Sequence, residues 1–154
     1  MKALPLIVSV LVAQSAGIVG SLFTASSVRT WYVDLTKPSW NPPSWLFGPV
    51  WITLYTMMGV AAYLVWQQKD SPGVKLALWF YAVQLALNAL WSILFFGARN
   101  PGLALAEISV LLVFILITTF LFWKINVWAG ILMLPYIAWV SFATFLNYTI
   151  LKLN

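Results

Sequence analysis

The side chains of this chain that could do chemistry are aromatic rings and amides rather than thiols, imidazoles or acids. Cysteine and histidine are absent, and only three of the 154 residues are Asp or Glu. This composition removes thiolate nucleophiles, imidazole bases and nearly all ordinary ligands of zinc, copper and haem iron. It therefore predicts no metal site and no cofactor. Any catalysis would depend on tryptophan as an electron donor to an excited, stacked ligand.

Three hydrophobic segments each place aromatic side chains together with small or amide residues on one helical face, at about 100° per residue. The three sets are Trp51, Tyr55, Met58, Ala62 and Trp66; Tyr81, Gln84, Asn88 and Trp91; and Tyr136, Trp139, Ala143 and Asn147. Because amides are unfavourable in hydrocarbon, we expect Gln84, Asn88 and Asn147 to point into the protein. Apolar, aromatic surfaces with a few convergent polar groups are typical of ligand pockets. The alternative is that the amides only join helices and the tryptophans form interfacial belts.

The one acid within a long hydrophobic segment is Glu107, and an intramembrane carboxylate is a functional candidate by default. Its alternatives are a structural pair with a nearby cation such as Arg99, or simple access to water. With no histidine, cysteine or second acid beside it, it is a weak indication of catalysis. The trio of Arg29, Asp34 and Lys37 is expected to form a clasp within a loop.

The elements that must position these side chains are transmembrane helices. The chain is 63% hydrophobic and 17% aromatic, so its polar residues could not cover a water-soluble domain. A spanning helix needs about 20 apolar residues. The sequence thus predicts a single all-α domain, 1–154, an integral membrane bundle with helices over about 4–28, 45–67, 74–96, 101–123 and 127–151. The cations lie singly or in pairs between the hydrophobic runs, which predicts membrane anchoring and no nucleic-acid partner.

Small residues in two helices predict close helix contacts. The first helix carries small residues four apart, in the rows Ala13, Gly17, Ser21 and Ala16, Gly20, Thr24, which allow close approach in lipid. In the third helix, Ala82, Ala86 and Ala89 lie opposite the face that carries the amides. Small residues on an outward face favour contact with another helix. That helix belongs either to a second copy in a homodimer or to the same bundle.

The long connection 29–44 is predicted to be a folded lid. Its prolines, Pro38, Pro42 and Pro43, prevent a continuous helix, and its aromatic residues make it too apolar for a disordered linker. Connections of this length in compact bundles are usually functional or disordered. We therefore expect the loop to cover the mouth between helices with its aromatic side chains turned inward.

Several segments together resemble the translocator protein family, whose members are also called tryptophan-rich sensory proteins or peripheral benzodiazepine receptors. The segments are Trp31-Tyr32, Lys37-Pro38-Ser39-Trp40-Asn41-Pro42-Pro43, Gly48-Pro49-Val50-Trp51 with Leu54-Tyr55, Gln84-Leu85-Ala86-Leu87-Asn88-Ala89-Leu90-Trp91, Phe95-Phe96-Gly97, Pro135-Tyr136-Ile137-Ala138-Trp139 and Phe142-Ala143-Thr144-Phe145-Leu146-Asn147-Tyr148. They follow one another in order over almost the whole chain.

The resemblance implies a five-helix bundle, usually dimeric, that binds porphyrins such as protoporphyrin IX, sterols in eukaryotic members, and synthetic isoquinoline and benzodiazepine drugs. It implies a pocket lined by Trp51, Asn88, Trp91, Trp139 and Ala143 under a lid made by the first loop. The complete expected binding set adds Trp31, Tyr32, Tyr55 and Tyr136.

The same resemblance implies a role as receptor, sensor or carrier in a bacterial envelope membrane or the mitochondrial outer membrane. Some bacterial members are similar to light-dependent porphyrin-degrading proteins, in which Trp51 and Trp139 would be the catalytic pair. A proposed sterol motif would fall on Leu146, Tyr148 and Lys152. That pattern occurs by chance in many membrane helices.

Overall fold

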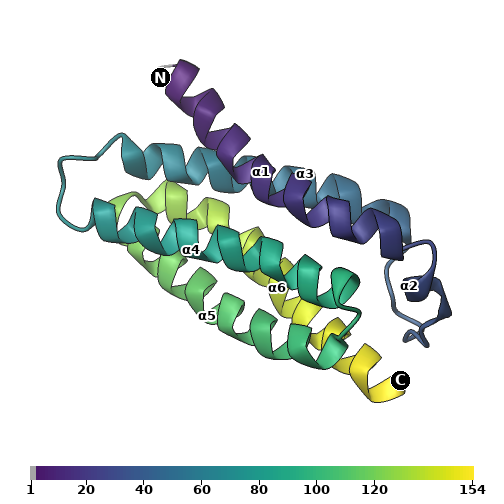
Figure 1. Cartoon of the computed structure of the whole chain (residues 1–154). Coiled ribbons are helices and arrows are strands. Elements are labelled where there is room, and N and C mark those ends of the chain that lie inside the picture. Colours follow the sequence, from purple (N-terminus) through teal and green to yellow (C-terminus); the bar gives the residue numbers. More distant parts are fainter. Residues whose placement is uncertain (1–2) are drawn as a thin grey trace.

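The structure is a computed structural model that describes residues 3–154, and all of its regular elements are helices (Figure 1). The elements are α1 (Ala3–Ser27), α2 (Trp31–Asp34), α3 (Ser44–Trp66), α4 (Val74–Ser92), the π-helical turn η1 (Ile93–Gly97), α5 (Pro101–Ile125) and α6 (Val127–Leu153). Five helices are long and apolar enough to cross a membrane, with α4 and η1 counted as one. This confirms the predicted all-α bundle of five transmembrane helices with a long folded loop after the first.

Asparagine side chains set the starts of the last two long helices. The Asn100 side chain accepts a hydrogen bond from the Leu103 amide at 2.9 Å, and Pro101 occupies the first turn of α5. The Asn126 side chain accepts from the Trp128 and Ala129 amides at 3.0 and 3.2 Å. Such caps satisfy the free amides at the start of a helix, so one residue suffices to separate α5 from α6.

The last turn of the third spanning segment is wider than the regular helix that the sequence predicts over 74–96. In η1 the Ala98 amide bonds to the Ile93 carbonyl at 2.7 Å, five residues back. A π turn carries one more residue than an α turn and so rotates the side chains that follow it. Phe95 and Phe96 are both buried here, and their rings contact Tyr32 of α2.

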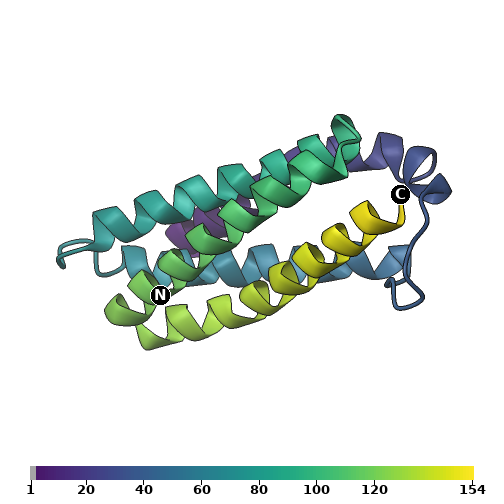
Figure 2. The ribbon, with the colours of Figure 1, turned by 90° about the horizontal axis from the view of Figure 1, so that it is seen from below.

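The helices α1 and α3 touch closely at one end of the bundle. The Ser9 hydroxyl donates to the Gly59 carbonyl at 2.7 Å, and a Cβ added to Gly59 would lie 2.5 Å from the Val10 Cα. Glycine is therefore required at this contact. Seen from below, α4 diverges from α3 toward the end that carries α2 and the C-terminus (Figure 2), whereas α6 stays against the start of α5 there, where the Asn147 amide donates to the Pro101 carbonyl at 2.8 Å.

The 29–44 connection is folded, and Lys37 is central to it. The Lys37 ammonium donates to the carbonyls of Tyr32, Val33 and Leu35 at 2.7, 3.1 and 2.8 Å, and it lies 4.9 Å from the Tyr32 ring centroid. It thus caps the C-terminal end of α2, where carbonyls lack helical partners. This cap replaces the clasp with Asp34 that the sequence led us to expect.

A second tie joins the loop to the other end of the chain. The Asn154 side chain accepts from the Thr36 amide and donates to the Thr36 carbonyl, both at 3.0 Å, and it also donates to the Ile150 carbonyl at 2.8 Å. On the same side of the molecule, Trp40 stacks on Phe145 at 5.3 Å between ring centroids. The loop is therefore fixed to α6 by polar and aromatic contacts.

Candidate functional site

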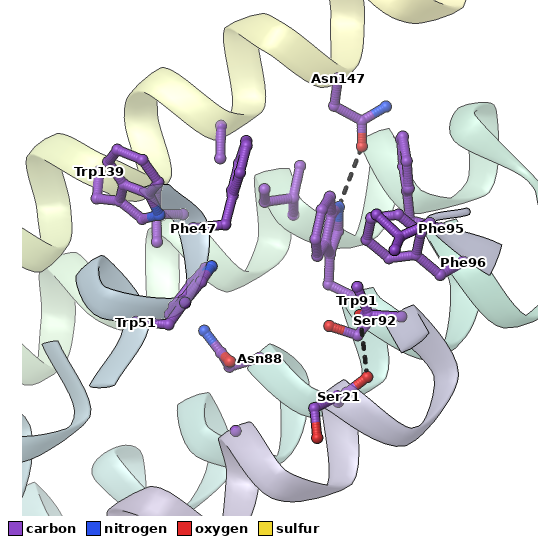
Figure 3. A pocket seen from close by; sticks show the side chains of 18 of the residues that line it. Ser21, Phe47, Trp51, Asn88, Trp91, Ser92, Phe95, Phe96, Trp139 and Asn147 are labelled. Atoms are coloured by element: carbon purple, nitrogen blue, oxygen red, sulfur yellow. Dashed lines mark hydrogen bonds between the residues drawn. The ribbon is translucent and has the colours of Figure 1, made fainter. Parts of the chain in front are cut away.

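A cavity of about 510 Å³ lies where the helices diverge, at the end of the bundle closed by α2 (Figure 3). The five long helices, the short helix α2 and η1 all contribute to its walls. The lining residues are Gln14, Gly17, Ile18, Gly20, Ser21, Thr24, Val28, Tyr32, Ser44, Phe47, Gly48, Trp51, Ile52, Tyr55, Asn88, Trp91, Ser92, Phe95, Phe96, Ile108, Leu111, Trp139, Val140, Ala143, Leu146, Asn147 and Ile150. None of them is charged, and most are apolar, so the cavity suits a ligand that is largely hydrophobic.

Three tryptophans from three helices surround the cavity (Figure 3). Trp51 stacks on Tyr55 at a centroid distance of 5.4 Å, and Trp91 stacks on Phe95 at 5.0 Å. Trp139 meets the ring of Phe47 edge to face at 5.8 Å. Stacked and edge-on contacts hold each indole in one orientation. The cavity thus presents fixed aromatic surfaces to a flat ligand.

A chain of buried hydrogen bonds supports the wall formed by Asn88. The Tyr55 hydroxyl donates to the Asn88 side-chain oxygen, and the Asn88 amide donates to the Tyr136 hydroxyl at 2.9 Å. Tyr136 in turn donates to Gln84 at 2.8 Å. Gln84 and Asn88 are 0% and 5% exposed, so their expected inward orientation is confirmed. A satisfied buried network of this kind fixes side-chain positions, because breaking it leaves polar atoms unpaired in an apolar interior.

Asn147 orients the second tryptophan. Its side-chain oxygen accepts from the Trp91 indole nitrogen at 3.1 Å, and its amide donates to the Pro101 carbonyl at 2.8 Å (Figure 3). Asn147 is 1% exposed, as its position in the sequence predicts. One amide thereby ties α4, α5 and α6 together beside the cavity.

The structure brings most of the predicted site residues together at this cavity. Those that line it are Tyr32, Trp51, Tyr55, Asn88, Trp91, Trp139 and Ala143. Trp31 and Tyr136 lie outside the lining. Trp31 packs edge-on against Phe95 at 5.6 Å, and Tyr136 is fully buried behind Asn88.

Two other sets of residues that the sequence placed on one surface lie on different surfaces in the structure. Trp66, assigned by periodicity to the inward face of α3, is 40% exposed at the end of that helix, with the Lys69 ammonium 5.9 Å from its ring. Of the three residues in the sterol pattern, Leu146 lines the cavity, whereas Tyr148 is 46% exposed and Lys152 lies over its ring on the outside. The pattern therefore does not form one continuous surface.

Sequence reasoning missed the contribution of α1. The small residues Gly17, Gly20, Ser21 and Thr24, which were expected only to permit close helix packing, line the cavity. A Cβ on Gly17 would lie 2.5 Å from the Tyr55 ring, so packing and cavity formation depend on the same glycine. The four-residue spacing of these small residues indicates a face of α1 that other groups can approach closely. It does not indicate whether a neighbouring helix or a cavity lies against that face.

Glu107 lies outside the cavity lining and is 9% exposed. Among residues 3–154, neither of its carboxylate oxygens has a hydrogen-bond partner, so the pair with Arg99 that was one expectation is not formed. Within the same described range there is no group of three or more acids, histidines or cysteines that could hold a metal ion.

The loop supplies the closed end of the cavity through Tyr32, which is 7% exposed. Its hydroxyl donates to the Asn41 side chain at 3.1 Å. Burial raises the pKa of the Tyr32 phenol above its ordinary value, an effect that the bond to Asn41 partly opposes. Tyr32 is therefore neutral at physiological pH.

A second, shallower hollow of about 300 Å³ lies on the outside of α1 and α4. It is lined by Val12, Ser15, Ala16, Val19, Tyr81, Ala82, Leu85, Ala86 and Ala89. Ala82 and Ala86 are exposed there. The alanine row of α4 thus borders α1 on one side and open surface on the other.

Comparison with known proteins gives a consistent assignment. The sequence matches the TspO/MBR family over residues 9–153. It is 41% identical to the tryptophan-rich protein TspO of Archaeoglobus fulgidus over 154 residues, which cover 100% of this chain and 99% of the relative. It is 44% identical to the tryptophan-rich sensory protein of Cereibacter sphaeroides over 124 residues, 80% of this chain and 77% of the relative.

A mammalian protein matches over a similar length. The translocator protein of Homo sapiens is 42% identical over 138 residues, which cover 88% of this chain and 82% of the relative. These matches confirm the resemblance stated from the motifs. With the five apolar helices, they make the protein a multi-pass integral membrane protein. Because the family match spans nearly the whole chain and the relatives match over most of their own lengths, the chain belongs to the TspO/MBR family.

Proposed function

We propose that this protein is a membrane receptor, acting as sensor or carrier, that binds a flat tetrapyrrole of the protoporphyrin IX kind in the aromatic cavity. The observation that carries the proposal is the cavity itself, about 510 Å³ in volume, with Trp51, Trp91 and Trp139 on its walls. Flat aromatic ligands gain from stacking on fixed indoles, and an uncharged lining favours the apolar ring. The names of the relatives, which include a sensory protein and a translocator protein, agree with a receptor role.

Quenching of tryptophan fluorescence tests the proposal. Protoporphyrin IX is expected to quench the protein saturably, since three tryptophans border the cavity. Replacing Trp51 and Trp139 together with Phe should diminish the specific quenching, while Trp91 remains at the cavity. Exposed Trp79 and Trp123, which lie outside the lining, give a matched double replacement that should retain saturable quenching with an unchanged Kd. Equal behaviour of the two double variants would remove Trp51 and Trp139 from the site.

A second candidate function is light-dependent breakdown of the bound porphyrin. It is favoured by the position of Trp51 and Trp139 on the cavity wall, where they could donate an electron to an excited ligand. Ligand consumption in light but not in darkness would support degradation, whereas a stable complex under illumination would support binding alone. A sterol is a further candidate for the same apolar cavity, and competition with protoporphyrin IX tests it.

We also propose that the protein is a homodimer through the outer face of α4. Support comes from the small residues Ala82, Ala86 and Ala89, which border an open hollow on the surface and allow a second helix to approach closely.

A further inference from the structure

We propose that ligands reach the cavity sideways from the bilayer, through a slit between α1 and the first half of α3, and not past the 29–44 loop. This inference rests on the proposed function, because it assigns a route to the same cavity. The slit is defined by five lining residues that also reach the surface: Ile18 and Ser21 of α1, and Ser44, Gly48 and Ile52 of α3.

Exposure locates the opening. The residues that both line the cavity and are exposed all belong to α1 and α3, and Ile18 and Ile52 are each 61% exposed. The loop end is closed instead. Tyr32 is 7% exposed there, with its ring 5.6 Å from Phe96 and 6.2 Å from Phe95. The cavity therefore meets the surroundings on the side of the bundle and not beneath the loop.

The slit follows from how α1 and α3 pack. They are held together at one end by the contact at Gly59 and, further along, by Gln14, which donates to the Ile52 carbonyl at 3.0 Å and to the Thr56 hydroxyl at 3.1 Å. Beyond Gln14 the slit is bordered by Ser21 of α1 and by Gly48 and Ser44 of α3, with the two isoleucines at its edges. A Cβ added to Gly48 would have nothing within 4 Å. The Gln14 bonds thus mark the closed end of the slit, and the space widens toward Ser44.

The surroundings of the slit define the ligands that can use it. Both helices are apolar enough to span a membrane, and isoleucines flank the opening, so it faces hydrocarbon. Its far end lies at Ser44, where α3 begins. Since α3 is long and apolar enough to span a membrane, we expect the headgroup level near this residue. A flat ring that carries acidic groups can therefore slide in edge first while its carboxylates stay at the headgroup level. The route suits amphipathic ligands dissolved in the bilayer rather than ligands dissolved in water.

Bulky side chains placed in the slit test the route. The variants are Ser21→Phe, Gly48→Phe and the two combined, in protein reconstituted into phosphatidylcholine vesicles with protoporphyrin IX as the probe. The matched controls are Leu22→Phe and Thr53→Phe, which add an aromatic ring to the exposed faces of the same two helices outside the cavity lining. Stopped-flow quenching gives association and dissociation rates. Gly48→Phe occupies open space, so it is expected to fold as the unaltered protein does.

A blocked route slows passage in both directions. We expect the association and dissociation rates both to fall by about tenfold or more in the combined variant. The controls should keep the rates of the unaltered protein. Unchanged rates in folded Gly48→Phe, or a lower association rate matched by an equally weakened Kd, would overturn the route. Asn154→Ala removes the hydrogen bonds between the loop and α6. If this variant binds and releases protoporphyrin IX faster than the unaltered protein, the ligand passes the loop and the proposed slit is wrong. If the unaltered protein shows no saturable quenching, the proposed function itself fails, and this inference fails with it.

Discussion

At the scale of single residues, two glycines of α3 have different roles, and two buried asparagines share one role. Gly59 lets the backbones of α1 and α3 touch, whereas Gly48, eleven residues earlier, borders empty space. Asn88 and Asn147 satisfy their polar atoms within the bundle and hold Tyr55 and Trp91 at the cavity. Gly59 and Gly48 are the same residue type in the same helix, so their different roles depend on what each one faces.

The two glycines provide a matched pair of substitutions. Gly59→Ala should destabilise the protein by about 1–3 kcal/mol, because the added Cβ would meet the Val10 backbone at 2.5 Å. Gly48→Ala should be neutral or stabilise by about 0.5–1 kcal/mol, since alanine favours the helix and meets no atom. Thermal unfolding in detergent measures both. A lower melting temperature for Gly48→Ala than for Gly59→Ala would contradict the packing described.

The absence of histidine and cysteine from the sequence predicts how the site treats iron. Free-base protoporphyrin IX and its iron form should bind with Kd values within about tenfold of each other, because only Tyr, Met or carboxylate side chains remain as ligands. Absorption and fluorescence titrations of the two forms provide the comparison. A strong preference for the iron form, with the spectrum of a ligated haem, would disprove binding by stacking alone.

At the scale of elements, the loop and η1 together build the closed end of the cavity. The π turn brings Phe95 and Phe96 against Tyr32, Lys37 caps α2, and Asn154 pairs with the Thr36 backbone. The Asn154 side chain thus makes the same pair of hydrogen bonds with the Thr36 backbone that a hydrogen-bonded residue pair makes in an antiparallel sheet. Both backbone polar groups of Thr36 are therefore bonded to the end of α6. In this structure the loop therefore forms a wall of the site and is attached to α6.

Removing that tie gives a prediction for the loop. Asn154→Ala should speed amide hydrogen exchange over residues 31–41, because the mutation removes both hydrogen bonds to Thr36. Leu153→Ala is the control, since this neighbour is 46% exposed and its truncation leaves the Asn154 bonds in place. Hydrogen exchange with mass spectrometry resolves the loop from the helices. Equal exchange in the two variants would show that Asn154 does not restrain the loop.

At the scale of the whole molecule, the bundle is tightly packed at one end and encloses a cavity near the other. α3 and α4 lie apart at the end that carries α2 and the C-terminus, and the cavity lies between them there (Figure 2). The outer hollow of α1 and α4 lies on a different face and includes the alanine row of α4 in its lining. The molecule thus separates the surface proposed for ligand binding from the surface proposed for self-association.

The proposed dimer is tested by filling the hollow on α4. Ala86→Trp places a large ring on the exposed alanine row and should convert the dimer to a monomer, because close helix approach requires small residues. Val110→Trp, on the lipid-facing side of α5, puts the same ring on a 50% exposed position and should leave the dimer intact. Light scattering of the detergent-solubilised proteins gives their masses. A dimer that survives Ala86→Trp would place its interface elsewhere.

The sequence by itself determined the spanning helices, the folded loop and the inward amides. The length of a hydrophobic run and the positions of Pro and Gly can be read directly from the sequence. An amide within a spanning segment is unfavourable toward lipid and therefore faces the interior of the bundle. Gln84, Asn88 and Asn147 are accordingly all buried. These features follow from the chain and its solvent without knowledge of how the helices are arranged.

Tertiary structure alone decided which inward residues reach the cavity. Tyr136 lies behind Asn88, Trp66 is exposed, and Gly17 of α1 lines the site, although helical periodicity gave no reason to separate them in this way. The outcome depends on where α1 and α3 separate, which is set by the contact at Gly59 and the Gln14 bonds between distant segments. A period of 3.6 residues specifies a face of one helix, but a cavity exists only where the faces of several helices fail to meet.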